Sequence, residues 1–293
     1  MNRPELKKLK GNLIMLLTAI IWGTSFISQK VGMETIKPAT FNGIRLLIGS
    51  LALLPLIILR RNKTISSERA SGKTLLISGI ICGTLLCLAT TVQTWGMMYT
   101  TSGKSGFITA MYIIFVPFFG IFLKKKIPKI AFISALIALL GLYLLCGLNE
   151  LTSLNFGDFL TLICAITFAF HILAIDHYSP KVDGIKLSCI QFFVAGIICF
   201  VIMLLFDKPD INLILNCAIP ILYSGLFSCG IAYTLQIIGQ RYTDPVSASI
   251  LMSLESVFAL ISGMLILGEP LSLIEFFGCI LMFGAIILNT LKA

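Results

Sequence analysis

Long apolar runs, separated by short polar connections, dominate the pattern of hydrophobic and polar positions along the chain. Ten such runs can be counted. Each has about 20 residues, enough at about 1.5 Å per residue to cross a hydrocarbon core of about 30 Å. The pattern predicts an all-α integral membrane protein with ten transmembrane helices. The predicted helices cover residues 11–29, 39–59, 73–97, 104–123, 129–148, 157–177, 185–205, 213–238, 246–267 and 271–291.

The two halves of the chain resemble each other. Matches at offsets of 143 or 146 residues pair Gly96 with Gly239, Tyr99 with Tyr242, Thr100 with Thr243, Gly11 with Gly157 and Arg45 with Gln191. Halves of five helices each have an odd number of crossings, so they must be inserted in opposite orientations, as in many secondary transporters. We therefore predict two inverted five-helix repeats, residues 11–148 and 157–291. Chance matches in Gly- and Leu-rich sequence are the alternative.

The amino-acid composition indicates that most of the protein surface is in contact with lipid rather than water. The chain is 57% hydrophobic and 12% charged, with a mean hydropathy of +1.00, whereas a soluble domain is about 25% charged. The nine cysteines lie almost entirely within apolar runs, and none forms a CxxC motif. They are interpreted as small packing residues, with no disulfide or metal expected.

The basic residues predict how the chain is inserted. A net charge of +9 could indicate nucleic acid, but the basic residues form short clusters between apolar runs, as the positive-inside rule describes. Of the 22 Lys and Arg, 17 lie on the side of the N-terminus, four lie on the other side, and Arg45 lies within a helix. We expect the cytoplasmic membrane, with both termini cytoplasmic, and no nucleic-acid partner.

Glu255 is the deepest ionisable residue. It lies about one-third of the way into the apolar stretch Ser253–Leu271, where a charged side chain costs about 2.5–3.5 kcal/mol or more and faces a cavity or a partner rather than lipid. It could bind a cationic group of a substrate, or take up and release a proton, which makes it the proton-coupling candidate. The alternative is a protonated or hydroxyl-paired side chain that only joins helices.

Two further ionisable residues lie within helices. Arg45 is about 9 Å from the outer end of its helix. It could reach the interface, or offer its planar guanidinium to a substrate carboxylate or to Glu255. His171 could relay protons or donate one hydrogen bond across a helix pair. Asp176 and His177 follow it off its helical face, so no metal site is expected.

A set of polar and aromatic residues lies within the same helices. They line a cavity or only join helices by hydrogen bonds. Tyr112 precedes Glu255 by 143 residues, so these two would face each other across the predicted pseudo-two-fold axis. No GxxxxGK[ST], GxSxG or HExxH motif occurs, so we expect neither an enzyme nor a cofactor. With the three ionisable residues, the predicted substrate-binding set is Trp22, Ser25, Arg45, Gln93, Tyr112, His171, Gln191, Tyr233, Gln236 and Glu255; Gln29 shares its character.

Three motifs resemble the EamA family of the drug/metabolite transporter superfamily. They are the WGTSF sequence of Trp22–Phe26, the stretch Tyr99–Pro117, and SLESV of Ser253–Val257 followed by LGEP of Leu267–Pro270. The sequence departs from the family pattern at two places. Ser256 stands where the family often has Pro, which puts a kink there in doubt. In the first repeat, Lys124–Lys126 stands at the position that corresponds to the LGE motif of the second repeat. The resemblance covers the whole chain and implies ten helices, two inverted repeats and movement of small metabolites, often export of amino acids.

These observations favour a secondary transporter or facilitator that moves a small polar metabolite by alternating access, and the family resemblance implies export as its direction. Arg45 and Glu255 offer opposite charges, which suits a zwitterion such as an amino acid. A non-transporting membrane sensor or assembly protein is one alternative, and a cavity between the halves would discriminate against it. A lipid-modifying enzyme is another, but no nucleophile and base cluster at either interface. The expected partners are a small-molecule substrate and the bilayer; the chain could be a monomer or a homodimer.

Overall fold

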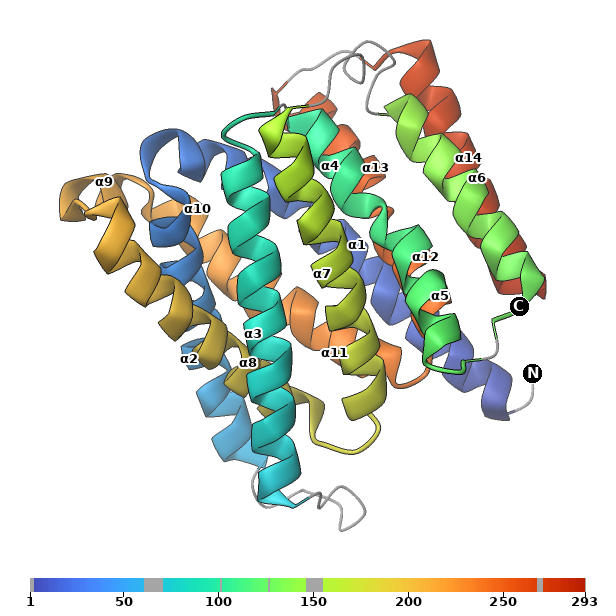
Figure 1. The fold of residues 1–293 in the computed structure, drawn as a ribbon, viewed down its shortest axis with the longest axis horizontal. Coiled ribbons are helices and arrows are strands. Elements are labelled where there is room, and N and C mark those ends of the chain that lie inside the picture. The colour runs from blue at the N-terminus through green and yellow to red at the C-terminus, as the bar shows by residue number, and fades with distance from the viewer. Residues whose placement is uncertain are drawn as a thin grey trace.

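The structure, a computed structural model of the chain, describes residues 3–60, 71–100, 102–125, 127–145, 155–267 and 271–292. All regular elements within these ranges are helices (Figure 1). Nine helical stretches among them are long and apolar enough to cross a membrane. The predicted all-α, membrane-spanning class is therefore confirmed. Lys126, residues 146–148 and Gly268–Pro270, which belong to predicted segments or motifs, lie outside the described residues.

The first half of the chain forms α1 to α6. The fourth predicted segment is divided into two helices by a turn at Met111. The described part of the fifth has 17 residues, at the short end of what a bilayer crossing needs, so the tenth crossing stays a prediction. The helices are α1 (Arg3–Thr35), α2 (Pro38–Arg60), α3 (Gly72–Gly96), α4 (Ser102–Ala110), α5 (Tyr112–Phe122) and α6 (Lys129–Leu145).

The second half contains more interruptions. The elements are α7 (Phe156–Tyr178), α8 (Gly184–Ile202), η2 (Met203–Asp207), α9 (Ile211–Asn216), α10 (Ala218–Tyr223), η3 (Ser224–Tyr233), α11 (Thr234–Gln240), α12 (Pro245–Met252), α13 (Glu255–Ser262), η4 (Gly263–Leu267) and α14 (Leu273–Lys292), where η marks π-helical turns.

One predicted boundary is wrong. The segment 213–238 was expected to be a single helix, but short α9 ends at Asn216 and the longer helical stretch begins at Ala218. Pro220 accounts for the division, because it has no N–H to donate to the carbonyl of Asn216. In the structure Pro220 lies in the first turn of α10, where the missing N–H costs nothing.

The helices of the two halves pack against each other across the molecule. α2 packs along α8 and α6 along α14, while α1 lies against α11–α13 and α7 lies against α3–α5 (Figure 1). α1 and α7, the first helices of the two predicted repeats, therefore each pack against helices of the other half. This reciprocal pairing is what two inverted repeats would produce, and it surrounds a space at the centre of the bundle with helices from both halves.

Candidate functional site

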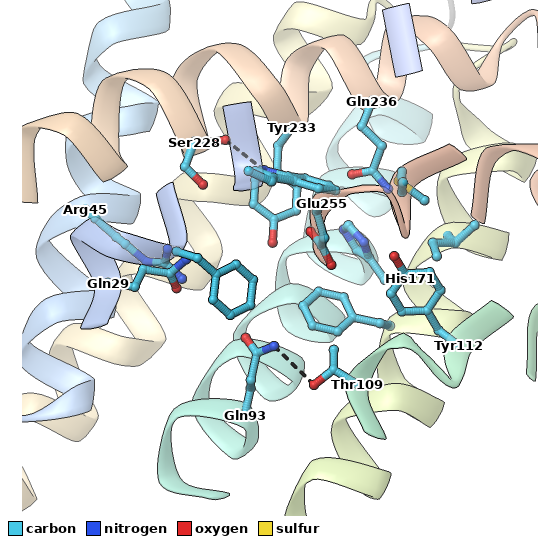
Figure 2. Close-up of a pocket in the computed structure, with 15 residues that line it drawn as sticks. Gln29, Arg45, Gln93, Thr109, Tyr112, His171, Ser228, Tyr233, Gln236 and Glu255 are labelled. Carbon is cyan, nitrogen blue, oxygen red and sulfur yellow. Dashed lines mark hydrogen bonds between the residues drawn. The ribbon is translucent and has the colours of Figure 1, made fainter. Parts of the chain in front are cut away.

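A cavity lies between the two halves, and side chains from both line it (Figure 2). The space that the centre of a water-sized sphere can occupy in it is about 50 Å³, so the cavity is small. The lining residues are Trp22, Phe26 and Gln29 of α1, Arg45 of α2, Gln93 of α3, Thr109 of α4, Tyr112 of α5, Phe168, His171 and Ile172 of α7, Ser228 and Tyr233 of η3, Gln236 of α11, Met252 of α12 and Glu255 of α13.

A break in the helix presents Glu255 to the cavity. α12 ends at Met252 and α13 begins at Glu255, and the Leu254 N–H bonds to the carbonyl of Leu251 rather than continuing the i→i−4 ladder. The Ser253 hydroxyl donates to the Ile250 carbonyl over 2.7 Å, a contact that bends helices. The helix is therefore interrupted without a proline, just before the position of Ser256, which itself lies inside α13.

The first half has a break at the matching place. Met111 forms the turn between α4 and α5, and its N–H bonds to the carbonyl of Ile108. Tyr112 follows this turn as Glu255 follows Leu254, and both side chains line the cavity (Figure 2). Discontinuous helices around a central site are typical of secondary transporters. They are tolerated at membrane depth because the interrupted backbone faces a cavity or protein rather than lipid.

The two charged residues of the cavity do not pair with each other. Among the described residues Glu255 has neither a hydrogen bond nor an ion pair, and its side chain is half-buried. The Arg45 side chain is 3% exposed, so it does not reach the interface. Its Nε donates to Asn42 Oδ1 over 2.9 Å, and its guanidinium lies 5.5 Å from the Phe41 ring centre. The rest of the guanidinium is directed to the cavity (Figure 2).

A buried polar cluster forms one end of the cavity. His171 is fully buried, and its Nε2 lies 3.2 Å from Gln191 Oε1 of α8. His171 Nδ1, the Tyr112 hydroxyl and Gln236 Oε1 are buried with no hydrogen-bond partner in the described structure. All three side chains point toward the region of the Glu255 carboxyl group (Figure 2). Buried polar atoms without partners are costly, so this end of the cavity suits a polar ligand.

Aromatic rings form much of the remaining wall. Trp22 and Tyr233 contact each other edge to face with ring centres 4.6 Å apart. The Trp22 Nε1–H donates to the Ser228 carbonyl over 3.4 Å, which fixes the indole on η3. Phe26 and Phe168 also face the cavity. Rigid aromatic walls with a few placed polar groups are typical of small-molecule sites.

The structure brings together eight of the ten residues predicted to bind substrate, and two lie elsewhere. Ser25 is fully buried outside the cavity lining, and Gln191 lies behind His171 rather than on the wall. Their part in binding, like that of the eight, stays a prediction. Sequence reasoning missed Phe26, Thr109, Phe168, Ile172, Ser228 and Met252.

Four of the missed residues carried a usable signal. Phe26 follows Trp22 by four positions and Thr109 precedes Tyr112 by three, so helical spacing places each on the face of a predicted site residue. Thr109 accepts a hydrogen bond from Gln93 Nε2 over 3.3 Å. Phe168 and Met252 precede His171 and Glu255 by three positions and had the same signal. Ile172 and Ser228 have no predicted site residue at this spacing.

Comparison with known proteins agrees with this architecture. The model of the EamA-like transporter family matches twice, over residues 9–147 and 155–291. An uncharacterized transporter of Archaeoglobus fulgidus is 30% identical over 98% of this chain and 87% of its own. The uncharacterized inner membrane transporter YedA of Escherichia coli is 26% identical over 93% of this chain and 88% of its own.

The fold also has a match among solved structures. One crystal structure superposes with a TM-score of 0.81 and covers 97% of both chains at 16% sequence identity, a likeness that concerns the fold alone. The double family match, together with the relatives and the apolar helices, describes a multi-pass membrane transporter. The chain belongs to the EamA-like transporter family.

Proposed function

We propose that the protein is a secondary transporter of the cytoplasmic membrane that exports small polar metabolites bearing both charges, such as amino acids. The observation that carries this proposal is the presence of Arg45 and Glu255 in one cavity without a salt bridge between them. A buried charge without a partner is strongly destabilising. A zwitterion would supply both partners at once, its carboxylate to Arg45 and its ammonium group to Glu255.

The cavity favours transport over the alternatives considered. A sensor or assembly protein has no need of a polar cavity between two halves, whereas alternating access requires one. We propose that the halves 11–148 and 157–291 rock around this cavity and expose it to each side in turn, with both termini cytoplasmic. Glu255 would also be the group that couples transport to protons, because a carboxyl group at this depth can exchange one only when the cavity is open to water.

Flux in proteoliposomes tests this function. The purified protein is reconstituted, and efflux of a panel of labelled amino acids is measured with and without a pH gradient. We expect Glu255→Gln to abolish the response to the gradient and to weaken binding of the ammonium group by about 10- to 100-fold, the cost of one charge-assisted hydrogen bond. Glu275→Gln is the matched control, since Glu275 lies in the first turn of α14 and outside the cavity lining. Full activity of Glu255→Gln at every pH would remove Glu255 from both roles.

A further inference from the structure

The two ends of the cavity differ in the hydrogen bonds they can make. Arg45, a donor only, lies at one end in Figure 2, while Glu255 lies beside His171 and Gln236 toward the other. His171 and Gln236 are 0% and 2% exposed, and His171 Nδ1 and Gln236 Oε1 have no hydrogen-bond partner in the described structure. The second end is thus built from three helices, α7, α11 and α13, each contributing one polar group.

The contact with Gln191 determines which ring nitrogen of His171 carries the proton. In the structure the Gln191 amide oxygen lies 3.2 Å from His171 Nε2; because an amide oxygen only accepts a hydrogen bond, this orientation of the amide places the proton on Nε2. In a neutral imidazole the other nitrogen is then a bare acceptor. His171 lines the cavity, and its Nδ1 is therefore an acceptor because of Gln191, which is not among the lining residues.

We infer that this end of the cavity recognises a primary ammonium group, and that Gln191 is the positioning residue that makes the recognition possible. The inference rests on the proposed function and specifies its substrate class. A primary ammonium group has three N–H donors, and the cavity offers it the Glu255 carboxylate, Gln236 Oε1 and His171 Nδ1. The Tyr112 hydroxyl is buried without a hydrogen-bond partner in the described structure. It can donate a hydrogen bond to an acceptor or accept one from a donor.

The aromatic wall offers a competing possibility that chemistry can distinguish. Trp22 and Tyr233, with ring centres 4.6 Å apart, could attract a quaternary ammonium group through their faces. Such a group has no N–H and would leave all three acceptors unpaired. A site that hydrogen-bonds a substrate discriminates strongly against an analogue that lacks the donor, so the acceptor set selects the primary ammonium group.

The test compares transport of free and modified amino acids. Counterflow in proteoliposomes is measured for the 19 protein amino acids that have a primary amino group and for the N-acetyl and N,N,N-trimethyl derivatives of each. We expect at least about a tenfold preference for the free amino group over both derivatives, because each derivative loses charge-assisted hydrogen bonds. Equal transport of the trimethyl derivatives overturns the inference alone. No transport of any compound overturns the inference together with the zwitterion function.

Variants of Gln191 test the positioning role separately. Gln191→Met removes the accepting oxygen, so we expect the preference for the free amino group to fall about five- to tenfold while the rates for the derivatives stay unchanged. Gln191→Glu keeps an accepting oxygen and should keep the preference. The control is Gln240→Met. Gln240 is also a buried glutamine, it is not among the lining residues, and it donates a hydrogen bond to the Ile172 carbonyl over 3.1 Å.

The outcomes of these variants are distinct. Gln240→Met should lower the melting temperature of the purified protein and leave the preference intact. An unchanged preference in Gln191→Met, or an equal loss in Gln240→Met, overturns the positioning role. If Gln191→Met does not fold, the native protein's preference among the derivatives and the behaviour of Gln191→Glu still decide the inference.

Discussion

Two arginines show how the surroundings of a single residue decide its role. Arg241 donates from Nε to the Ser179 carbonyl over 2.6 Å and from Nη2 to the Val182 carbonyl over 2.5 Å, so it fastens the connection between α7 and α8. Within the described residues Arg45 makes one hydrogen bond, to Asn42, which leaves its terminal nitrogens for the cavity. The same side-chain chemistry therefore serves structure in one place and, we propose, a ligand in the other.

Substitution of Arg45 should affect binding more than folding. Arg45→Gln removes the charge that would meet a substrate carboxylate, and we expect binding of a transported amino acid to weaken about 10- to 100-fold. Arg45→Lys keeps the charge but loses the planar fork, so an intermediate loss is expected. Isothermal titration or thermal shift with the transported amino acid measures both. For comparison, Arg241→Lys should lower the melting temperature and leave the affinity unchanged; the opposite pattern would count against the assignment of Arg45.

At the scale of helices, small residues determine how closely elements pack. α6 and α14 cross where Gly141 meets Gly278: a Cβ added to Gly141 would lie 2.8 Å from the Gly278 carbonyl oxygen, and one added to Gly278 would lie 2.7 Å from that of Gly141. Backbone cannot move aside as a flexible side chain can. Close backbone approach at glycine is a common way for membrane helices to associate, and here it joins the last helices of the two predicted repeats.

Glycine substitutions in this helix pair should have opposite effects. Gly141→Ala places a methyl group within 2.7 Å of Met282 Cγ and against backbone, so we expect a loss of about 1–3 kcal/mol in the free energy of unfolding, the usual cost of overpacking. Gly284→Ala has open space around the new methyl group and should gain up to about 1 kcal/mol through higher helix propensity. Unfolding in mixed micelles measures both. Equal effects would show that the crossing is not closely packed.

Across the whole molecule, two matching contacts join the predicted repeats at their opposite ends. At one end Gly157 packs on Gly96, and the Thr100 hydroxyl donates to Asp158 over 2.7 Å. At the other end Gly11 packs on Gly239, Thr243 bonds to Asn12 over 3.2 Å, and these residues are the sequence matches of the first set. This correspondence supports the inverted-repeat proposal, because chance matches in sequence would not make the same contact twice.

The two contacts differ in charge, so they should differ in strength. Asp158 forms a buried ion pair with Lys104 at 2.6 Å, whereas Asn12 is neutral. Asp158→Leu leaves a buried Lys104 without this carboxylate, and we expect a loss of about 3–5 kcal/mol in the free energy of unfolding. Asn12→Leu loses one neutral hydrogen bond, about 1 kcal/mol. Unfolding of both variants in the same micelles compares them, and a similar cost for both would mean that the charge contributes nothing.

The sequence by itself determined the solvent of this protein and identified most of the polar residues that line its cavity. Apolar runs of bilayer length leave no other fold class, because an uncovered backbone cannot cross hydrocarbon. Within such runs a charged residue is rare and costly, so Arg45 and Glu255 could be identified without a structure. Both line the cavity, together with six further residues that were chosen because they are ionisable, polar or aromatic and lie within the predicted helices.

Only the tertiary structure decided which way each polar side chain points. Ser25 is three residues from Trp22 yet lies outside the cavity lining, and Gln191 contacts the lining residue His171 without lining the cavity itself. Transmembrane helices are apolar on all sides, so no polar stripe reports how a helix is rotated about its axis. The break before Glu255 was equally hidden, because serine hydroxyls rather than a proline accompany it. Rotation and bending are fixed by packing against helices far away in the chain, and the local sequence does not contain that information.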